Sequence, residues 1–215
     1  MTSPSDVAKF HAEYDIHVDD RVRLFRAIAT VIAPSSRVLY PGSYVDIGPS
    51  VWFDDVTYVD MDKRAARFFA ETTSVTELVM AKRHAAGAAP APVAVAFHHL
   101  DYRDALPIEP GSIGLLASLY AGLVSEHCTE LLSTGGHLLV NPSHGDAAMA
   151  SIDQRYELAG VVIARDGDYR VDTKNLNEYL QPKKAQTLSA ESIRQSGRGI
   201  AYTRSPFAYL FSKVG

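Results

Sequence analysis

The segment at residues 37–62 (RVLYPGSYVDIGPSVWFDDVTYVDMD) constrains the fold more than any other part of the chain. It contains an apolar strand at 38–40, a turn at Pro41 and Gly42, a short link, and a second apolar strand at 56–59 that ends on Asp60. A glycine turn after one strand and an acidic residue about 20 positions later are typical of an open parallel sheet that holds a nucleoside-containing cofactor. The glycine lets the backbone approach the ligand, and the carboxylate accepts hydrogen bonds from ribose hydroxyls. We therefore expect Gly42 and Asp60 to lie at one cofactor site.

The rest of the chain alternates apolar strands with helical stretches, which predicts a parallel α/β sheet. Further strands are expected at 93–97, 113–119, 137–141, 156–164, 169–171 and 202–214, with the turn signal Asp166-Gly167 between two of them. Helices are expected from Asp19 or Asp20 to Pro34, from Asp62, from Ser74 to His84 with a stop at Gly87, at 122–133 and at 189–195.

A chain of 215 residues fits one domain with a sizeable core, and 47% apolar and 21% charged residues are typical of a soluble globule. We divide it into N-terminal cover helices (1–34), a cofactor-binding core (35–145) and a C-terminal part with substrate walls (146–215). Segments 1–18 and 173–186 are candidates for a lid or walls around the substrate. A homodimer is compatible with the sequence, which does not fix the oligomeric state.

Charge and cysteine content indicate the partners and the compartment. The net charge of −4 gives no electrostatic reason to expect a nucleic-acid partner. The single cysteine, Cys128, excludes an internal disulfide and is expected to be a packed thiol of a protein in a reducing compartment. No apolar run has the roughly 20 residues of a membrane helix, and the polar N-terminus is unlike a secretory signal. The sequence predicts a cytoplasmic protein with no membrane partner.

Four motifs of the chain resemble those of the class I S-adenosylmethionine-dependent methyltransferases: VLYPGS, VTYVD, LDYRDALPIEPGSIGLLASLYAG and LLSTGGHLLVNPS. The resemblance covers roughly residues 37–141 in detail and the remainder in layout. It implies a Rossmann-like, doubly wound, mostly parallel seven-stranded sheet with an antiparallel C-terminal strand. It also implies S-adenosylmethionine as the cofactor and methyl transfer as the reaction.

The same resemblance assigns roles to individual residues. Asp60 would take the ribose hydroxyls, Met61 would pack on the adenine, and Asp101 would meet the adenine amino group. In the alternative reading Asp60 caps the following helix, and Asp62 is the fallback for the ribose. The remaining implied cofactor contacts are Tyr40, Pro41, Gly42 and Ser43 in the first turn, Tyr102 beside Asp101, and Ser118 and Leu119 after the fourth strand. Ser118, Leu119 and Tyr120 would form the floor near the reactive methyl group.

The first turn departs from the acidic-x-Gly-x-Gly-x-Gly pattern of that family. Tyr40 stands at the acidic position, and Tyr44 and Asp46 stand where the second and third glycines would be. A register on Gly48 leaves only about 12 residues before Asp60, too few for a turn, a helix and a strand. Gly114 also replaces a common aspartate.

These departures leave alternatives open. The first is a catalytically inactive relative that serves as a binding or assembly module. An enzyme using a nicotinamide dinucleotide is less favoured, because the pyrophosphate of that cofactor needs the missing second glycine more.

A polar cluster at 141–146 follows the predicted fifth strand, at the edge where open sheets place their active sites. His144 is a candidate general base because its unperturbed pKa lies near neutrality. In the alternative reading Ser143 and Asp146 cap the next helix and His144 is merely exposed. No His, Cys, Asp and Glu residues have metal-ligand spacing, so no metal is expected. With Tyr120 and His144 as candidate catalytic residues, the sequence predicts methyl transfer to a small molecule.

Overall fold

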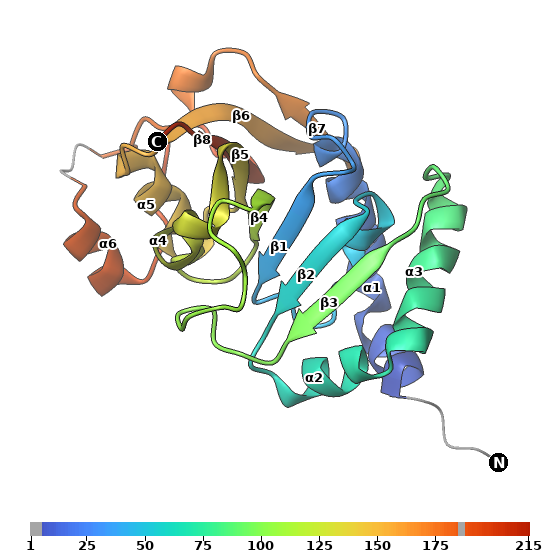
Figure 1. The fold of residues 1–215 in the computed structure, drawn as a ribbon. Coiled ribbons are helices and arrows are strands. Elements are labelled where there is room, and N and C mark those ends of the chain that lie inside the picture. Colours follow the sequence, from blue (N-terminus) through green and yellow to red (C-terminus); the bar gives the residue numbers. More distant parts are fainter. Residues whose placement is uncertain (1–5, 185–187) are drawn as a thin grey trace.

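The computed structural model describes residues 6–184 and 188–215, and within them eight strands form one sheet (Figure 1). The strands are β1 (Arg37–Pro41), β2 (Asp55–Val59), β3 (Ala94–His98), β4 (Ile113–Ser118), β5 (Leu132–Val140), β6 (Tyr156–Arg165), β7 (Asp168–Asp172) and β8 (Ala208–Lys213). Their order in the sheet is β3-β2-β1-β4-β5-β8-β6-β7. Parts of the expected walls at 1–18 and 173–186 fall on residues 1–5 and 185–186, outside the described residues.

The helices of the described residues are α1 (Asp6–Ile28), α2 (Lys63–Ala70), α3 (Thr72–Ala86), α4 (Val124–Cys128), α5 (Asp146–Ile152) and α6 (Ala190–Ser196). Short 3-10 turns stand at η1 (Gly48–Val51), η2 (Thr129–Leu131), η3 (Ser143–Gly145) and η4 (Leu176–Glu178). None of these helices is long and apolar enough to span a bilayer.

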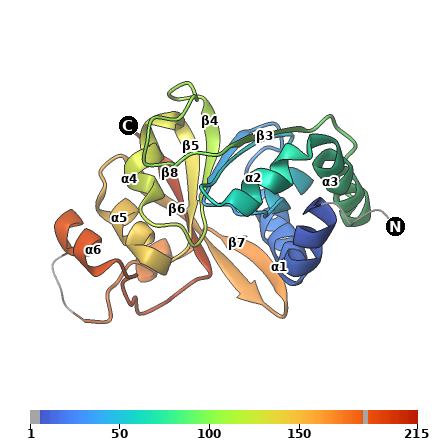
Figure 2. The same ribbon diagram turned by 90° about the horizontal axis from the view of Figure 1, so that it is seen from below.

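The sheet separates two layers of helices (Figure 2). Strand residues alternate between the layers: Val38 and Tyr40 pack with the core under α1, α2 and α3, whereas Leu39 packs with the core under α4 and α5. This alternation is the period-two pattern of a strand buried on both faces. The expected Rossmann-like, doubly wound α/β class is confirmed.

The strand directions also match the expectation. Over the described residues the sheet has eight strands, whereas the resemblance implied seven. The first five strands pair in parallel, and β8 is antiparallel to both β5 and β6. The strand expected at 169–171 is β7, which pairs antiparallel with β6. Asp166 (φ 53°) and Gly167 (φ 76°) close this hairpin, since two consecutive left-handed residues match the twist of paired strands.

The N-terminal helix is longer than the sequence pattern predicted. It begins at Asp6 rather than at a cap on Asp19 or Asp20. Asp20 lies within α1, and its carboxylate accepts hydrogen bonds from the guanidinium groups of Arg21 and Arg23 and from the hydroxyl of Tyr169 in β7. The segment between β1 and β2 forms only η1, and α1 packs against it.

Other predicted boundaries were also partly wrong. The expected cap Ser74 lies inside α3, although Gly87 (φ 70°) ends that helix as predicted. The helix expected at 122–133 is only α4 and η2, because β5 begins at Leu132 and pairs there with Ile113. The last strand is confined to β8. The predicted helix at 189–195 is confirmed as α6, with Ser189 as its cap.

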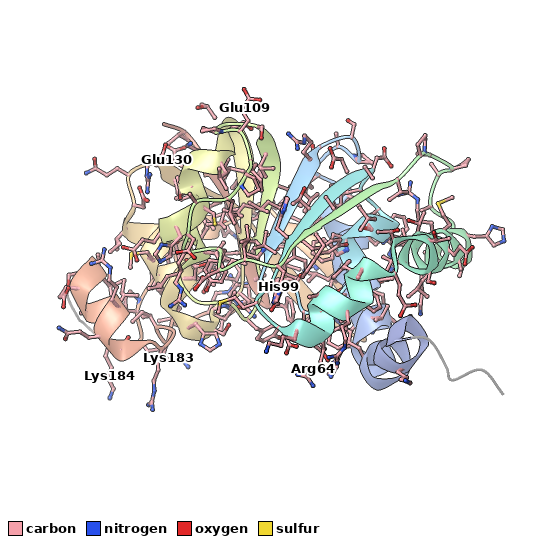
Figure 3. All side chains as sticks on the ribbon, turned by 60° about the horizontal axis from the view of Figure 1, so that its bottom comes forward. Arg64, His99, Glu109, Glu130, Lys183 and Lys184 are labelled. Atoms are coloured by element: carbon pink, nitrogen blue, oxygen red, sulfur yellow. The ribbon has the colours of Figure 1, made fainter. Side chains whose placement is uncertain are left out.

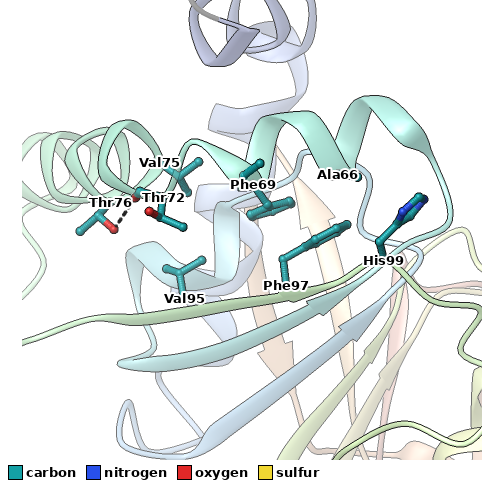
Figure 4. A pocket seen from close by; sticks show the side chains of 9 residues that line it. Ala66, Phe69, Thr72, Val75, Thr76, Val95, Phe97 and His99 are labelled. Atoms are coloured by element: carbon teal, nitrogen blue, oxygen red, sulfur yellow. Dashed lines mark hydrogen bonds between the residues drawn. The ribbon is translucent and has the colours of Figure 1, made fainter.

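An aromatic stack fastens α2 to the edge of the sheet. Phe69 of α2 stacks on Tyr58 at 4.9 Å and on Phe97 at 4.7 Å between ring centroids, and it is only 5% exposed. It also helps to line a cavity of about 290 Å³ between α2, α3 and β3 (Figure 4).

Phe69→Ala is therefore expected to lower the free energy of unfolding by about 3–5 kcal/mol, because it removes buried ring contacts and leaves a cavity. Met80→Ala is the matched control, since Met80 lies on α3 with 43% of its surface exposed, and it should change stability by less than about 0.5 kcal/mol. Urea denaturation of both variants measures the difference, and equal losses would refute the assignment.

Candidate functional site

The candidate site lies at the carboxyl ends of the parallel strands, where the strand order reverses between β1 and β4. Among the described residues, the non-glycine residues with left-handed backbone include Tyr44 after β1, Tyr120 and Leu123 after β4, and His144 after β5. Bulky residues adopt this conformation at a cost, and such residues cluster at functional sites.

Asp60 meets the turn after β1, as the sequence predicted. Its Oδ2 accepts a hydrogen bond from the backbone N–H of Tyr44 at 2.7 Å, and its Oδ1 accepts one from the N–H of Asp62 at 2.8 Å. The N–H of Gly42 donates to the carbonyl of Val59 at 2.8 Å. Each carboxylate oxygen has a second lone pair, so the partly exposed Asp60 can accept two further donors.

Gly42 is required by two features of its surroundings. Its φ of 68° is left-handed, and an added Cβ would lie 2.8 Å from the Cβ of Ala121. The turn after β1 is thus packed directly on the turn after β4, and only a residue without a side chain allows this approach.

Apolar side chains are exposed in the turns after β2 and β3. Met61 follows β2 with 59% of its surface exposed, and Leu100 follows β3 with 38% exposed. The imidazole Nε2 of His99 lies 2.9 Å from the carbonyl oxygen of Met61, so the two turns are joined. Figure 3 looks toward this edge and shows His99 at its centre, with Arg64 on the neighbouring start of α2.

Asp101 lies in the turn after β3, at the position assigned to it. Arg103 donates to it through Nε at 2.9 Å and through its backbone N–H at 3.0 Å. These hydrogen bonds, with the side-chain one first, lower the pKa of Asp101 below its ordinary value. The carboxyl is therefore an ionised acceptor at neutral pH.

Several assigned residues lie beneath this surface. Tyr40 is 2% exposed and its hydroxyl donates to Asp46, and Ser118 is fully buried with its hydroxyl donating to Asp146. Both hydroxyls are thus engaged within the protein, and the cofactor contacts assigned to Tyr40 and Ser118 stay predictions. Ser43 and Leu119 are each 2% exposed, and Pro41 is buried as well. The hydroxyl of Tyr102 donates to the carbonyl of Gly122 at 2.8 Å.

The sequence did not predict the role of Asp46, which is fully buried at the position of a family glycine. Its Oδ1 accepts from the N–H of Gly48 at 2.8 Å, and its Oδ2 accepts from the hydroxyl of Tyr40 at 3.1 Å. Burial, the largest effect, raises the pKa of Asp46 to about 6. The Asp-x-Gly spacing, which favours a side-chain-to-backbone turn, was the available signal.

Arg21 of α1 is the charged partner of Asp46, and the sequence analysis missed it too. Its Nε lies 3.6 Å from Oδ2 of Asp46, and its guanidinium lies 5.2 Å from the ring centroid of Tyr120 and 6.0 Å from that of Phe207. The side chain is 9% exposed. Arg21 thus connects α1 to the turns after β1 and β4.

His144 is exposed and stands in η3 directly after β5. The side-chain oxygen of Asn141 accepts from the N–H of Tyr120 at 3.3 Å and from the hydroxyl of Ser143 at 2.5 Å. These hydrogen bonds join the turns after β4 and β5.

The capping alternative for this cluster is not observed. Gly145 is the N-cap of α5, and the carboxylate of Asp146 reaches back to Ser118 and Ser125.

Two further expectations concern metals and Cys128. Within residues 6–184 and 188–215, no three His, Cys, Asp or Glu residues are grouped to hold a metal ion. Cys128 is buried, as predicted, and burial raises the pKa of its thiol to about 12. This thiol is therefore a packing group rather than a nucleophile.

Comparison with solved structures supports the fold. A candidate S-adenosyl-L-methionine-dependent methyltransferase from Methanococcus maripaludis aligns over 80% of this chain and 95% of its own, with 12% identity and a TM-score of 0.50. An rRNA methylase from Streptococcus thermophilus aligns over 89% and 95%, with 12% identity and a TM-score of 0.47. Geranyl diphosphate C-methyltransferase from Streptomyces coelicolor aligns over 91% and 77%, with 12% identity and a TM-score of 0.49.

No family model and no curated protein sequence matches the chain. At these identities the likeness establishes the fold alone. The chain has the Rossmann-like fold that is found in class I S-adenosylmethionine-dependent methyltransferases.

The buried carboxyl of Asp46 generates a pH-dependence of stability. Because its folded-state pKa of about 6 lies above the ordinary 3.8, the folded protein binds the proton more tightly. The resulting stabilisation is complete below pH 3.8 and is lost as the pH rises through 6.

The difference in unfolding free energy between the wild type and Asp46→Asn should therefore rise by about 2 kcal/mol from pH 7 to pH 4. Denaturant unfolding at both pH values measures it. Asp166→Asn controls for the removal of an exposed carboxylate, since the side chain of Asp166 is 88% exposed. A difference that does not vary with pH would contradict the buried position of Asp46.

Proposed function

We propose that the protein binds S-adenosylmethionine and transfers its methyl group to a small molecule. The observation that carries this proposal is the position of Asp60. Its carboxylate lies where the turn after β1 meets the end of β2, directly before the exposed residue Met61. An acceptor for a diol next to an apolar surface suits a nucleoside.

The residues present fit such a cofactor. Asp60 retains lone pairs for the ribose hydroxyls, Met61 and Leu100 offer apolar surface to the adenine, and Asp101 is an ionised acceptor for the exocyclic amine. The backbone of the turn at Gly42 and Tyr44 lies against Asp60. The cofactor supplies an electrophilic sulfonium methyl group, and the protein supplies binding and alignment.

His144 is the proposed general base. It is exposed at the carboxyl end of β5, and hydrogen bonds through Asn141 tie its turn to that of Tyr120. An acceptor hydroxyl or amine loses its proton when it is methylated, and a neutral imidazole takes up a proton near neutral pH.

A small acceptor is favoured by the net charge of −4, which offers no general attraction to nucleic acid. We propose that the described parts of 1–18 and 173–186 form walls around the substrate. The division into cover helices (1–34), a cofactor-binding core (35–145) and a C-terminal part (146–215) remains a proposal. A cytoplasmic location and a homodimer remain predictions.

The alternative is an inactive relative that serves as a binding or assembly module. It is favoured by one observation: both oxygens of Asp60 already accept backbone hydrogen bonds. Calorimetric titration with S-adenosylmethionine, S-adenosylhomocysteine and NAD separates the readings. Binding of the first two without the third supports the proposal, whereas binding of none supports the module.

Asp60→Ala should weaken the binding of S-adenosylhomocysteine by about 1–3 kcal/mol, because a charged hydrogen-bond acceptor is lost. The matched control is Asp55→Ala, since Asp55 stands at the opposite end of β2 from Asp60 and its side chain is 40% exposed. Calorimetry measures both variants. A dissociation constant unchanged by Asp60→Ala would remove the ribose assignment.

His144→Ala should lower the turnover of an identified acceptor by about a hundredfold or more while the affinity for S-adenosylhomocysteine stays the same. His127→Ala is the control, because His127 is also exposed but lies on α4. Mass spectrometry of the methylated product measures turnover. Wild-type rates in the His144 variant would end its role as the base.

A further inference from the structure

Tyr120 presents an aromatic ring to solvent at the candidate site, and Arg21 and Asn141 contact it on the protein side. It is 54% exposed, although it follows a buried strand. The guanidinium of Arg21 lies over its ring, and its backbone N–H donates to Asn141. Its φ of 63° is rare for a bulky residue. Tyrosine is enriched at binding surfaces, where its ring offers apolar contact area and its hydroxyl meets water.

Tyr44 stands in the neighbouring turn, where its ring is partly exposed and packs in part against the core. Its φ is 49°, the guanidinium of Arg64 lies 5.0 Å from its ring centroid, and the ring of Tyr14 contacts it edge-on at 5.7 Å. The turns that carry Tyr44 and Tyr120 are packed on each other through Gly42 and Ala121.

The charges around these two rings select against a cationic ligand. Each ring already has a guanidinium over one face. The neighbouring carboxylates are engaged: Asp46 is fully buried, Asp20 accepts from Arg21, Arg23 and Tyr169, and Asp62 pairs with Arg64 at 3.0 Å. Asp60 accepts two backbone N–H groups and is assigned to the ribose of the cofactor, which is bound when the acceptor enters. An ammonium group at this surface would meet two like charges and no available carboxylate among these residues, whereas an uncharged or anionic aromatic ring would stack favourably.

We propose that Tyr44 and Tyr120 form the platform on which the methyl acceptor stacks, and that this acceptor is a planar aromatic molecule with an ionisable hydroxyl group, a phenol. This inference rests on the proposed function and specifies its substrate class. The hydroxyl is chosen because a neutral acceptor of this kind must lose a proton, and His144 stands at the same edge to receive it.

The test measures binding rather than turnover. The wild-type protein, saturated with S-adenosylhomocysteine, is titrated in a calorimeter with 4-methylphenol, 4-methylbenzylamine and 4-methylcyclohexanol. The amine keeps the ring but carries a positive charge, and the cyclohexanol keeps the hydroxyl but lacks the aromatic ring. Saturable binding of 4-methylphenol alone is the expected result.

Variants connect this binding to the platform. Tyr120→Ala and Tyr44→Ala should each weaken 4-methylphenol binding about tenfold. Tyr120→Phe should bind 4-methylphenol as the wild type does, because the ring is kept. Circular dichroism shows whether each variant is folded, and every titration is made at a concentration of S-adenosylhomocysteine that saturates that variant, because both residues border the proposed cofactor site.

The outcomes separate this inference from the proposed function. If S-adenosylhomocysteine does not bind the wild type, both fall. If it binds but 4-methylphenol does not, the inference is overturned and the function stands. The inference is equally overturned if the amine or the cyclohexanol binds as tightly, or if both alanine variants keep wild-type affinity for 4-methylphenol.

Discussion

Burying a carboxylate costs several kcal/mol unless hydrogen bonds and an opposite charge compensate, and the candidate site is organised around such a group. Asp46 has no exposed surface, yet it accepts hydrogen bonds from Gly48 and Tyr40 and lies against Arg21 of α1. A partly satisfied buried network would be unstable, so these partners have to stay in place together. This requirement fixes the turn after β1 relative to the N-terminal helix.

The position of that turn determines the rest of the edge. Because the turn is fixed, the N–H of Tyr44 reaches Asp60, and Gly42 lies against Ala121. Arg21 in turn supports the ring of Tyr120, and Asn141 connects Tyr120 to the turn that carries His144. The residues proposed to hold the cofactor, the acceptor and the proton thus belong to one continuous set of contacts.

The departures from the glycine-rich turn acquire a physical reason in this arrangement. Asp46 makes internal hydrogen bonds at the position where a family glycine would allow a ligand to approach closely. The short link expected between the two strands contains only η1. A short link between β1 and β2 leaves that face of the sheet to α1. The site therefore combines the strand order of a doubly wound sheet with a turn that is stabilised by the hydrogen bonds of Asp46.

The sequence by itself determined the strand alternation, the fold class and the convergence of the turn at Gly42 with Asp60, because these follow from local periodicity and from the shared edge of parallel strands. It also indicated the burial of Cys128. Only the tertiary structure decided that Arg21 and Asp46 pair, that Tyr40 and Ser118 are buried, and that the guanidinium of Arg21 lies over the exposed ring of Tyr120. Those outcomes depend on how α1 packs across the sheet, and contacts between residues far apart in the chain leave no local pattern in the sequence.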